Sequence, residues 1–301
     1  MTVWAFVLTP LLVLPIVLLL RFIGCRSFDP EPPPPETPKA PRYRDLIMGE
    51  ADIIAYWRLV DPVAGPDVAV DEKGFRNGEY RTSANADTIP GNFITGQPGL
   101  IVSDPKALCR FFNGGFVLVP FKDGLYTDEF TIEAWIRPGF PAGSEHMMFE
   151  AGGHYVRPFE STARYHGFYI FAINNRWQVR LQPVAGPDPQ TGNVFSAPPI
   201  IPSGVTHLAV TVENASPGGA KKKVTLFIDG KVAGLATTTG YYSLPDGAPL
   251  LIGVGGGGSD PTDPDPTELR KPIRSHVQEV VLHRRALSQK EVENRVANNP
   301  P

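Results

Sequence analysis

The chain has 301 residues, a formal net charge of −3, 30 glycines and 33 prolines. Its length fits one large or two medium-sized domains, and its charge provides no basic surface for binding nucleic acid. The predicted strands are short and separated by turn residues, which favours an all-β sandwich or barrel.

The chain begins with a long apolar segment. Residues 3–23 are nearly all apolar, and their number matches the ~20 residues that a helix needs to cross a bilayer. We therefore expect residues 1–26 to form a transmembrane anchor that contacts membrane lipid. Its predicted membrane-facing side chains are Trp4, Phe6, Leu11, Leu18 and Arg21.

Two other interpretations of this segment stay open. A cleaved secretory signal would begin with basic residues, and residues 1–3 contain none. A lipoprotein signal would make Cys25 the acylated residue, although residues 22–24 match such a signal only loosely. An uncleaved anchor fits the length best.

A proline-rich stretch follows. Residues 27–41 include four consecutive prolines at positions 32–35. Proline fixes φ and has no amide N–H, so this stretch predicts an extended, semi-rigid spacer. The predicted organisation is an anchor (1–26), a Pro-rich linker (27–41) and a globular domain (42–301).

Alternating apolar and polar residues predict the strands of this domain. In residues 130–136, Phe130, Ile132, Ala134 and Ile136 share one face of a strand, and Trp135 lies on the opposite face. Further strands are expected at residues 53–59, 107–112, 116–119, 168–173, 176–181, 207–212, 223–228, 250–254 and 277–282.

Short-range signals locate two turns and one helix. Asp229-Gly230 supplies the left-handed residues of a type I′ hairpin turn, and residues 174–175 are expected to form another hairpin turn. Residues 288–291 form a capping box that opens a helix at 289–297. Cys109 falls in a strand and is expected to be a small buried hydrophobic residue.

Five short motifs occur in an order typical of one protein family. They are AYWRL (55–59), DEKGFRNGEY (71–80), FTIEAWI (130–136), HLAVT with LFIDGK (207–211 and 226–231), and QEV with RALS and Glu291 (278–291). Together they resemble the laminin-G-like branch of the concanavalin A-like lectin/glucanase superfamily over residues 50–298. The resemblance implies a jelly-roll sandwich of two antiparallel sheets and implies little about activity, because this fold hosts lectins, adhesion modules and glycosidases.

The chain lacks the carboxylate pattern of related glucanases. A retaining glycosidase needs two carboxylates roughly 5–5.5 Å apart. The related enzymes carry them in an E-x-D-x-x-E run, which is absent here. Glu129 and Glu133 are the nearest approach, and Glu133 matches a family position found in non-catalytic members. We therefore predict no catalytic residues, no enzyme activity and no cofactor.

The weak candidate for a metal site is an acidic loop at residues 255–268. Asp260, Asp263 and Asp265 offer the oxygen ligands that Ca²⁺ prefers. Their spacing matches no known calcium loop, and a solvated acidic loop is the main expectation.

Long insertions offer candidates for a protein contact. Residues 138–167 and 182–203 are rich in glycine, proline and aromatic residues, and loops of this length are usually functional or disordered. The interaction candidates in the first insertion are Met147, Met148, Phe149, Tyr155, Phe159 and Tyr165.

Two functions follow from these observations. The first is a non-enzymatic, membrane-anchored interaction domain that acts as an extrinsic accessory subunit of a larger membrane complex, for example a respiratory or photosynthetic one. The alternative is a cell-surface carbohydrate-binding module. The resemblance favours an extracytoplasmic domain, periplasmic or on the cell surface, whereas Arg21 and Arg26 after the apolar segment would place the domain in the cytoplasm.

Overall fold

The computed structural model describes residues 42–60, 67–82, 92–101, 104, 107–140, 145–152, 154–155, 164–165, 167–182, 194–195, 198–219, 221–238, 247–256 and 269–298. They belong to one compact unit, Ala40–Pro301. The predicted anchor with Trp4, Phe6, Leu11, Leu18 and Arg21, and the predicted linker, precede these residues and stay predictions. Within the described part of the chain, no helix is long and apolar enough to cross a membrane.

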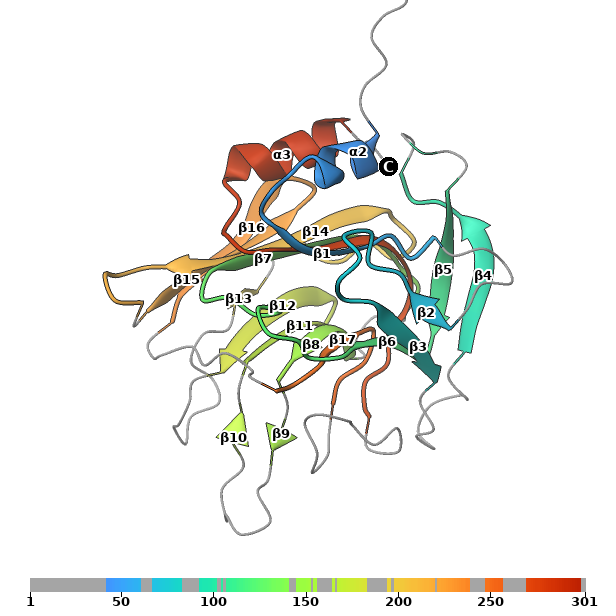
Figure 1. The fold of residues 1–301 in the computed structure, drawn as a ribbon, viewed down its shortest axis with the longest axis horizontal. Coiled ribbons are helices and arrows are strands. Elements are labelled where there is room, and N and C mark those ends of the chain that lie inside the picture. Colours follow the sequence, from blue (N-terminus) through green and yellow to red (C-terminus); the bar gives the residue numbers. More distant parts are fainter. Residues whose placement is uncertain are drawn as a thin grey trace, which may run out of the picture. The chain divides into compact units, whose positions relative to one another are not determined.

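Two antiparallel sheets face one another, as the family resemblance implied (Figure 1). The first sheet has the order β16 (Lys231–Thr237), β15 (Lys222–Ile228), β14 (Thr206–Asn214), β7 (Phe130–Pro138), β18 (Arg274–His283), β5 (Leu108–Asn113) and β4 (Asn92–Pro98), and β1 (Ile53–Trp57) also pairs with β18. The described chain is therefore an all-β sandwich.

The second sheet has the order β13 (Val194–Phe195), β12 (Arg176–Gln182), β11 (Gly167–Ile173), β8 (His146–Ala151), β17 (Leu250–Ile252), β6 (Gly115–Val119), β3 (Gly78–Thr82) and β2 (Val68–Ala69). Strands β9 (His154–Tyr155) and β10 (Arg164–Tyr165) form a separate two-stranded ribbon. Helices α2 (Tyr43–Met48) and α3 (Gln289–Asn298) lie next to the first sheet (Figure 1).

The predicted faces of β7 are confirmed. Phe130, Ile132, Ala134 and Ile136 are buried in the main core between the sheets. Trp135 points to the other side and packs with Tyr43 and Ile47 of α2 in a second cluster. Val210 of β14 pairs with both Ile132 and Leu226, so three neighbouring strands contribute side chains to the same layer of the core.

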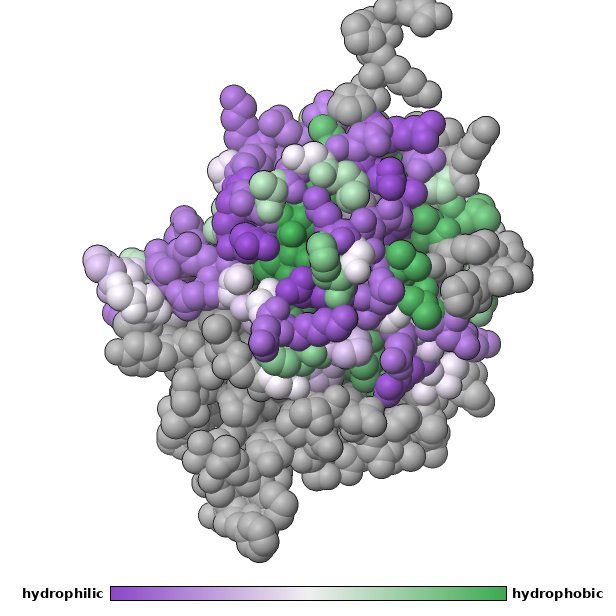
Figure 2. All heavy atoms as spheres, in the orientation of Figure 1, coloured by the Kyte–Doolittle hydropathy of each residue, from purple (hydrophilic) through white to green (hydrophobic). Residues whose placement is uncertain are grey.

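The face seen in Figure 2 is largely polar, with small apolar patches between polar side chains.

The two predicted hairpin turns are also confirmed. Asn174 and Asn175 have φ values of 50° and 60°, and they join β11 to β12. Asp229 and Gly230 have φ values of 50° and 78°, and they join β15 to β16. Left-handed φ at both central residues defines a type I′ turn, whose twist matches that of the strands it connects.

The cysteine and capping-box predictions are confirmed as well. Cys109 is a buried, free thiol, and burial raises its pKa to about 11. Ser288 N donates to Glu291 Oε2 at 2.7 Å, and Ser288 Oγ accepts from Glu291 N at 3.4 Å. Helix α3 therefore begins where the capping box places it.

Candidate functional site

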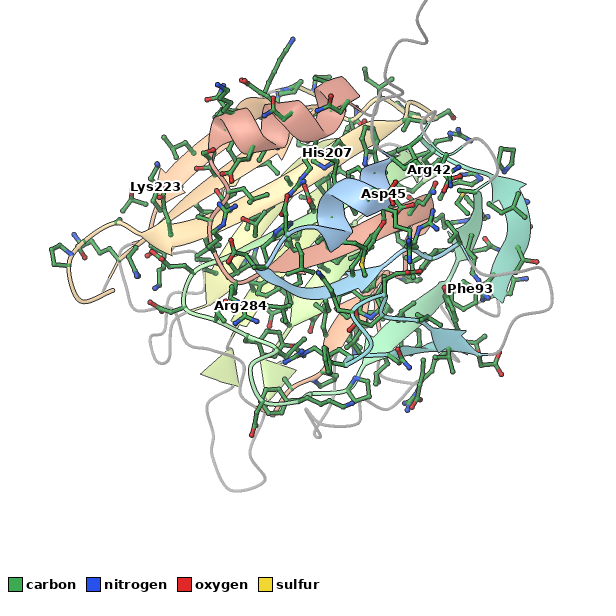
Figure 3. The ribbon with its side chains drawn as sticks, turned by 45° about the horizontal axis from the view of Figure 1, so that its top comes forward. Arg42, Asp45, Phe93, His207, Lys223 and Arg284 are labelled. Atoms are coloured by element: carbon green, nitrogen blue, oxygen red, sulfur yellow. The ribbon has the colours of Figure 1, made fainter. Side chains whose placement is uncertain are left out.

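Glu133, the carboxylate nearest to a glucanase position, is fully buried on the outer side of the first sheet. Its Oε2 lies 3.1 Å from His207 Nε2, and its Oε1 lies 3.0 Å from His283 Nε2. Arg295 Nε of α3 lies 3.3 Å from the same Oε1. Figure 3 shows His207 on the sheet close to the two helices. No substrate can reach a carboxylate enclosed in this way.

Glu133 is ionised in this environment. Burial alone would raise its pKa, but Arg295 and the hydrogen bonds from His207 and His283 outweigh burial and hold the pKa well below its usual range. Because an ionised carboxylate only accepts hydrogen bonds, both histidines donate from Nε2. Glu133 therefore joins β7, β14, β18 and α3 as a structural anion.

The expectation that residues 138–167 form a long insertion suited to a protein contact is corrected at its start. Met147, Met148 and Phe149 belong to β8, a buried central strand of the second sheet, and their side chains are buried. The prediction was wrong because Met147, Met148 and Phe149 are three consecutive apolar residues and lack the alternation that would have signalled a strand. Tyr155 and Tyr165 lie in β9 and β10, and Phe159 and all side chains of this ribbon lie outside the described residues.

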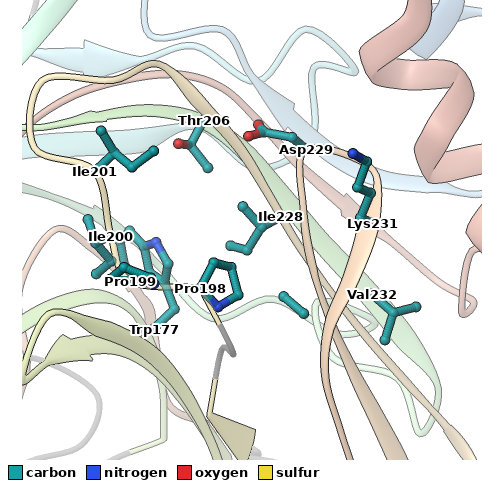
Figure 4. A pocket seen from close by; sticks show the side chains of 11 residues that line it. Trp177, Pro198, Pro199, Ile200, Ile201, Thr206, Ile228, Asp229, Lys231 and Val232 are labelled. Carbon is teal, nitrogen blue, oxygen red and sulfur yellow. The ribbon is translucent and has the colours of Figure 1, made fainter.

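An open cleft of about 410 Å³ lies where the edges of the two sheets approach each other (Figure 4). Strand β16 ends the first sheet, and β13 and β12 end the second. The apolar part of the lining consists of Trp177, Pro198, Pro199, Ile200, Ile201, Ile228, Val232 and Ala233. We call this the edge cleft. Its volume and its mainly apolar walls are typical of ligand-binding pockets.

Among the 11 described residues that line the edge cleft, three are polar, namely Thr206, Asp229 and Lys231. Asp229 Oδ1 already accepts a hydrogen bond of 2.8 Å from His207 N. On the apolar side, Ile201 is 69% exposed and Val232 is 47% exposed. Large apolar side chains that are this exposed beside a cleft are characteristic of interaction sites.

A second, more polar pocket of about 190 Å³ lies on the outer side of the second sheet. Glu150 of β8, Tyr169 of β11 and Arg180 of β12 are direct cross-strand neighbours along its floor. Arg270 and Lys271 contribute to its wall, and Lys271 Nζ forms an ion pair of 2.7 Å with Glu145. We call this the Glu150 pocket. Sequence analysis missed it because its residues come from segments far apart in the chain.

Glu150 itself is buried, and Gly256 N donates to its Oε2 at 2.8 Å. A Cβ atom on Gly256 would lie 2.9 Å from Oε1, so a larger residue at this position would displace the Glu150 carboxyl group. Burial raises the pKa of Glu150 to about 8, which the hydrogen bond from Gly256 and the charge of Lys271 only partly offset. The carboxyl group is therefore mostly protonated at neutral pH.

The calcium candidates Asp260, Asp263 and Asp265 lie outside the described residues, so a calcium site there stays a prediction. Among the residues that the structure describes, no three histidine, cysteine, aspartate or glutamate side chains are grouped so that they could hold a metal ion.

The family model for the concanavalin A-like lectin/glucanases superfamily matches residues 111–293 of the chain. No curated protein sequence matches the chain significantly.

Solved structures with the same fold have low sequence identity to this chain. Domain 4 of the extracellular arabinanase AbnA from Geobacillus stearothermophilus, in complex with arabinotriose, is 17% identical with a TM-score of 0.51, covering 82% of this chain and 98% of that domain. The binding domain of paraclostridial mosquitocidal protein 1 is 13% identical with a TM-score of 0.51, covering 81% of this chain and 51% of its own. The receptor-binding domain of botulinum neurotoxin type G is 12% identical with a TM-score of 0.50, and the coverages are 82% and 51%. The present chain thus spans about half the length of these two toxin domains.

Proposed function

Because the chain belongs to the concanavalin A-like lectin/glucanase superfamily, we propose that it is a non-enzymatic binding module that holds an apolar segment of a partner protein in the edge cleft. The observation that carries this proposal is the cleft itself, with its apolar walls and the exposed side chains of Ile201 and Val232. The toxin domains with the same fold are named as binding domains, which is consistent with a binding role.

The chemistry of the edge cleft favours a protein segment over a sugar. A sugar ring carries hydroxyl groups on most of its carbons, and each hydroxyl that is buried without a partner is costly. The three polar residues in the described part of the lining are too few to satisfy them, and Asp229 Oδ1 already accepts a backbone hydrogen bond from His207 N. An apolar side chain gains free energy simply by leaving water.

The edge of the first sheet supports the same occupant. In the described part of the chain, β16 pairs with β15 on one side only, so an extended partner segment could add to its free edge. Leu235, also on β16, is 60% exposed and would extend the apolar contact. Backbone hydrogen bonds between β16 and the partner segment would then provide affinity. The edge cleft would select which side chain of the partner is bound.

The proposal retains the membrane anchor. Residues 1–26 would hold the domain at the membrane, residues 27–41 would limit its reach, and the partner would be a subunit of a membrane complex on the extracytoplasmic side. Carbonate washing of membranes tests the anchor, and protease accessibility in intact cells tests the side. Release of the chain by carbonate would refute the anchor and leave the edge cleft proposal intact.

The test of the edge cleft compares two exposed isoleucines. Ile201 lines the cleft, whereas Ile94 is 45% exposed on β4 at the opposite end of the first sheet. Full-length protein and its Ile201→Lys and Ile94→Lys variants are purified with bound proteins in mild detergent and compared by quantitative mass spectrometry. We expect Ile201→Lys to reduce a specific partner at least tenfold and Ile94→Lys to retain it.

Equal recovery of every bound protein by both variants would refute the edge cleft as the contact. A glycan array with the same proteins examines the alternative of a carbohydrate-binding module. Saturable binding of a neutral glycan that Ile201→Lys abolishes would assign the cleft to sugar instead. A β-glucan hydrolysis assay completes the set, because turnover that Glu133→Gln removes would contradict a non-enzymatic role.

A further inference from the structure

We propose that the Glu150 pocket is a second binding site, which holds the carboxylate group of a compact organic acid about the size of one sugar ring. This site is separate from the edge cleft, since the two share no lining residue. The argument rests on the charges around the pocket, on the position of one proton and on the size of the cavity.

The charges that face the pocket favour an anion. The positive side chains are Arg180 from β12 and Arg270 and Lys271 from the segment before β18. Glu145 neutralises one of these charges through its ion pair with Lys271. With Glu150 protonated, positive side chains outnumber negative ones among the described residues that line the pocket, and an ionised ligand carboxylate would be attracted to them.

Glu150 adds a directed hydrogen-bond donor. Because Oε2 accepts the hydrogen bond from Gly256 N, the proton of the neutral carboxyl group resides on Oε1. Oε1 is buried and has no hydrogen-bond partner among the described residues. A buried donor without an acceptor is destabilising, so a ligand oxygen placed there would remove an existing penalty.

The size and walls of the pocket limit the ligand. A volume of about 190 Å³ has room for several water molecules or for one small ring, and not for an extended chain. Met147 and Phe171 add apolar surface for the body of the ligand, and Arg180 lies 5.3 Å from the Phe171 ring. Gly255 and Gly256 keep this side open, because a side chain on either would press on the Glu150 carboxyl group.

The pocket should bind its anion less tightly as the pH rises. Glu150 becomes ionised above pH 8, the value to which burial raises its pKa, and its negative charge would then repel a ligand carboxylate. Among the described residues, the other charged groups that line the pocket are Arg180, Arg270, Lys271 and Glu145.

The experiment measures binding of D-glucuronate to the full-length protein in detergent micelles by isothermal titration calorimetry, with D-glucose as the uncharged matched probe. We expect glucuronate to bind at millimolar or lower concentration at pH 6.5, glucose to bind at least tenfold more weakly, and the glucuronate affinity to fall at least fivefold by pH 9. The cleft variant Ile201→Lys should bind glucuronate normally, which keeps this test independent of the proposed function.

Three variants locate the site. Arg180→Gln should weaken glucuronate binding at least tenfold, whereas Arg176→Gln, on the same strand but outside the lining, should leave it unchanged. Glu150→Gln keeps a neutral donor and should remove the loss of affinity between pH 6.5 and pH 9. Thermal unfolding confirms that each variant is folded, and the pH series of the unmodified protein requires no variant.

The proposal is overturned by any of three results: no binding of glucuronate, equal binding of glucose, or equal loss of affinity in Arg176→Gln and Arg180→Gln. It is also overturned if the unmodified protein binds glucuronate equally well at pH 6.5 and pH 9, because ionised Glu150 would then not face the ligand.

Discussion

Nε2 of His283 lies 3.0 Å from Oε1 of Glu133, and neither side chain is exposed to solvent. The contact joins β18 to β7 on the outer side of the first sheet, where Arg295 of α3 adds a positive charge. Arg295 Nη2 also lies 2.6 Å from Glu50 Oε1, just before β1. One buried carboxylate therefore links residues from both ends of the domain.

Removing the charge of Glu133 should destabilise the domain strongly. Glu133→Gln replaces an acceptor oxygen with an NH₂ donor that would face a donor from His207, His283 or Arg295, and it leaves Arg295 buried with less compensation. We expect a loss of about 3–5 kcal/mol in the free energy of unfolding, measured with urea. Glu293→Gln, on the exposed side of α3, is the matched control and should change stability by less than about 0.5 kcal/mol. Equal effects of both variants would contradict a structural role for Glu133.

Acid should destabilise the domain through the same residue. The pKa of Glu133 is held well below its usual value of 4.5, so its contribution is fully present above pH 4.5 and is lost as the pH falls through the lower pKa of the folded state. Urea unfolding at pH 6, 4 and 3 should show the difference between the unmodified protein and Glu133→Gln becoming smaller. A constant difference across this range would mean that Glu133 is not ionised in the folded state.

Glu150 should have the opposite dependence on pH. Its pKa rises from 4.5 to about 8 on folding, so the unfolded chain loses this proton at a lower pH than the folded one. The resulting penalty grows between pH 4.5 and pH 8 by up to about 1.4 kcal/mol per pH unit. Glu150→Gln should therefore be more stable than the unmodified protein at pH 8.5 and lose this advantage at pH 4.5. If the stability difference between the two proteins is the same at pH 4.5 and pH 8.5, folding does not raise the pKa of Glu150.

The core prediction concerns Ile132, which is buried between the sheets. Ile132→Ala should lower the free energy of unfolding by roughly 2–5 kcal/mol, because it removes apolar contacts and leaves a cavity. Ile94→Ala, at an exposed position on β4, is the control and should cost less than about 1 kcal/mol. A small effect at Ile132 would refute the observed register of β7.

Asp71 should stabilise the N-terminal part of the domain, because it accepts hydrogen bonds from four backbone amides. Its Oδ1 accepts from Tyr56 N at 2.8 Å and from Lys73 N at 3.0 Å, and its Oδ2 accepts from Phe75 N at 3.1 Å and from Arg76 N at 2.9 Å. Asp71→Ala leaves these amides without a partner and should cost about 2–4 kcal/mol. Asp67→Ala, at an earlier exposed position, should have little effect, and a similar loss in both variants would indicate a general effect of charge.

The Asp71 contacts also explain why a family motif was recognisable from sequence. A loop with this hydrogen-bond pattern needs aspartate at position 71, and Asn77 Oδ1 accepts from Asp71 N at 2.9 Å. Both residues are part of the motif DEKGFRNGEY, so the sequence alone shows them. The residues that make the resemblance specific therefore hold the backbone of this loop in place through hydrogen bonds to its amide groups. They say nothing about a ligand, which is why the resemblance predicted the fold and left the function open.

The resemblance to a known family implied the two antiparallel sheets. The sequence by itself determined the all-β class, the faces of β7, both hairpin turns and the start of α3. Each of these depends on neighbouring residues, through the period of two in a strand, left-handed φ in a turn, or side-chain contacts within one helical turn. Only the tertiary structure decided that Met147, Met148 and Phe149 are core residues and that Glu133 is enclosed. The same holds for Glu150, which meets Arg180 and Lys271 in a shared pocket although the three are separated by long stretches of chain. Burial and charge pairing between distant segments depend on how the sheets stack and pair, and no local pattern of residues records that arrangement.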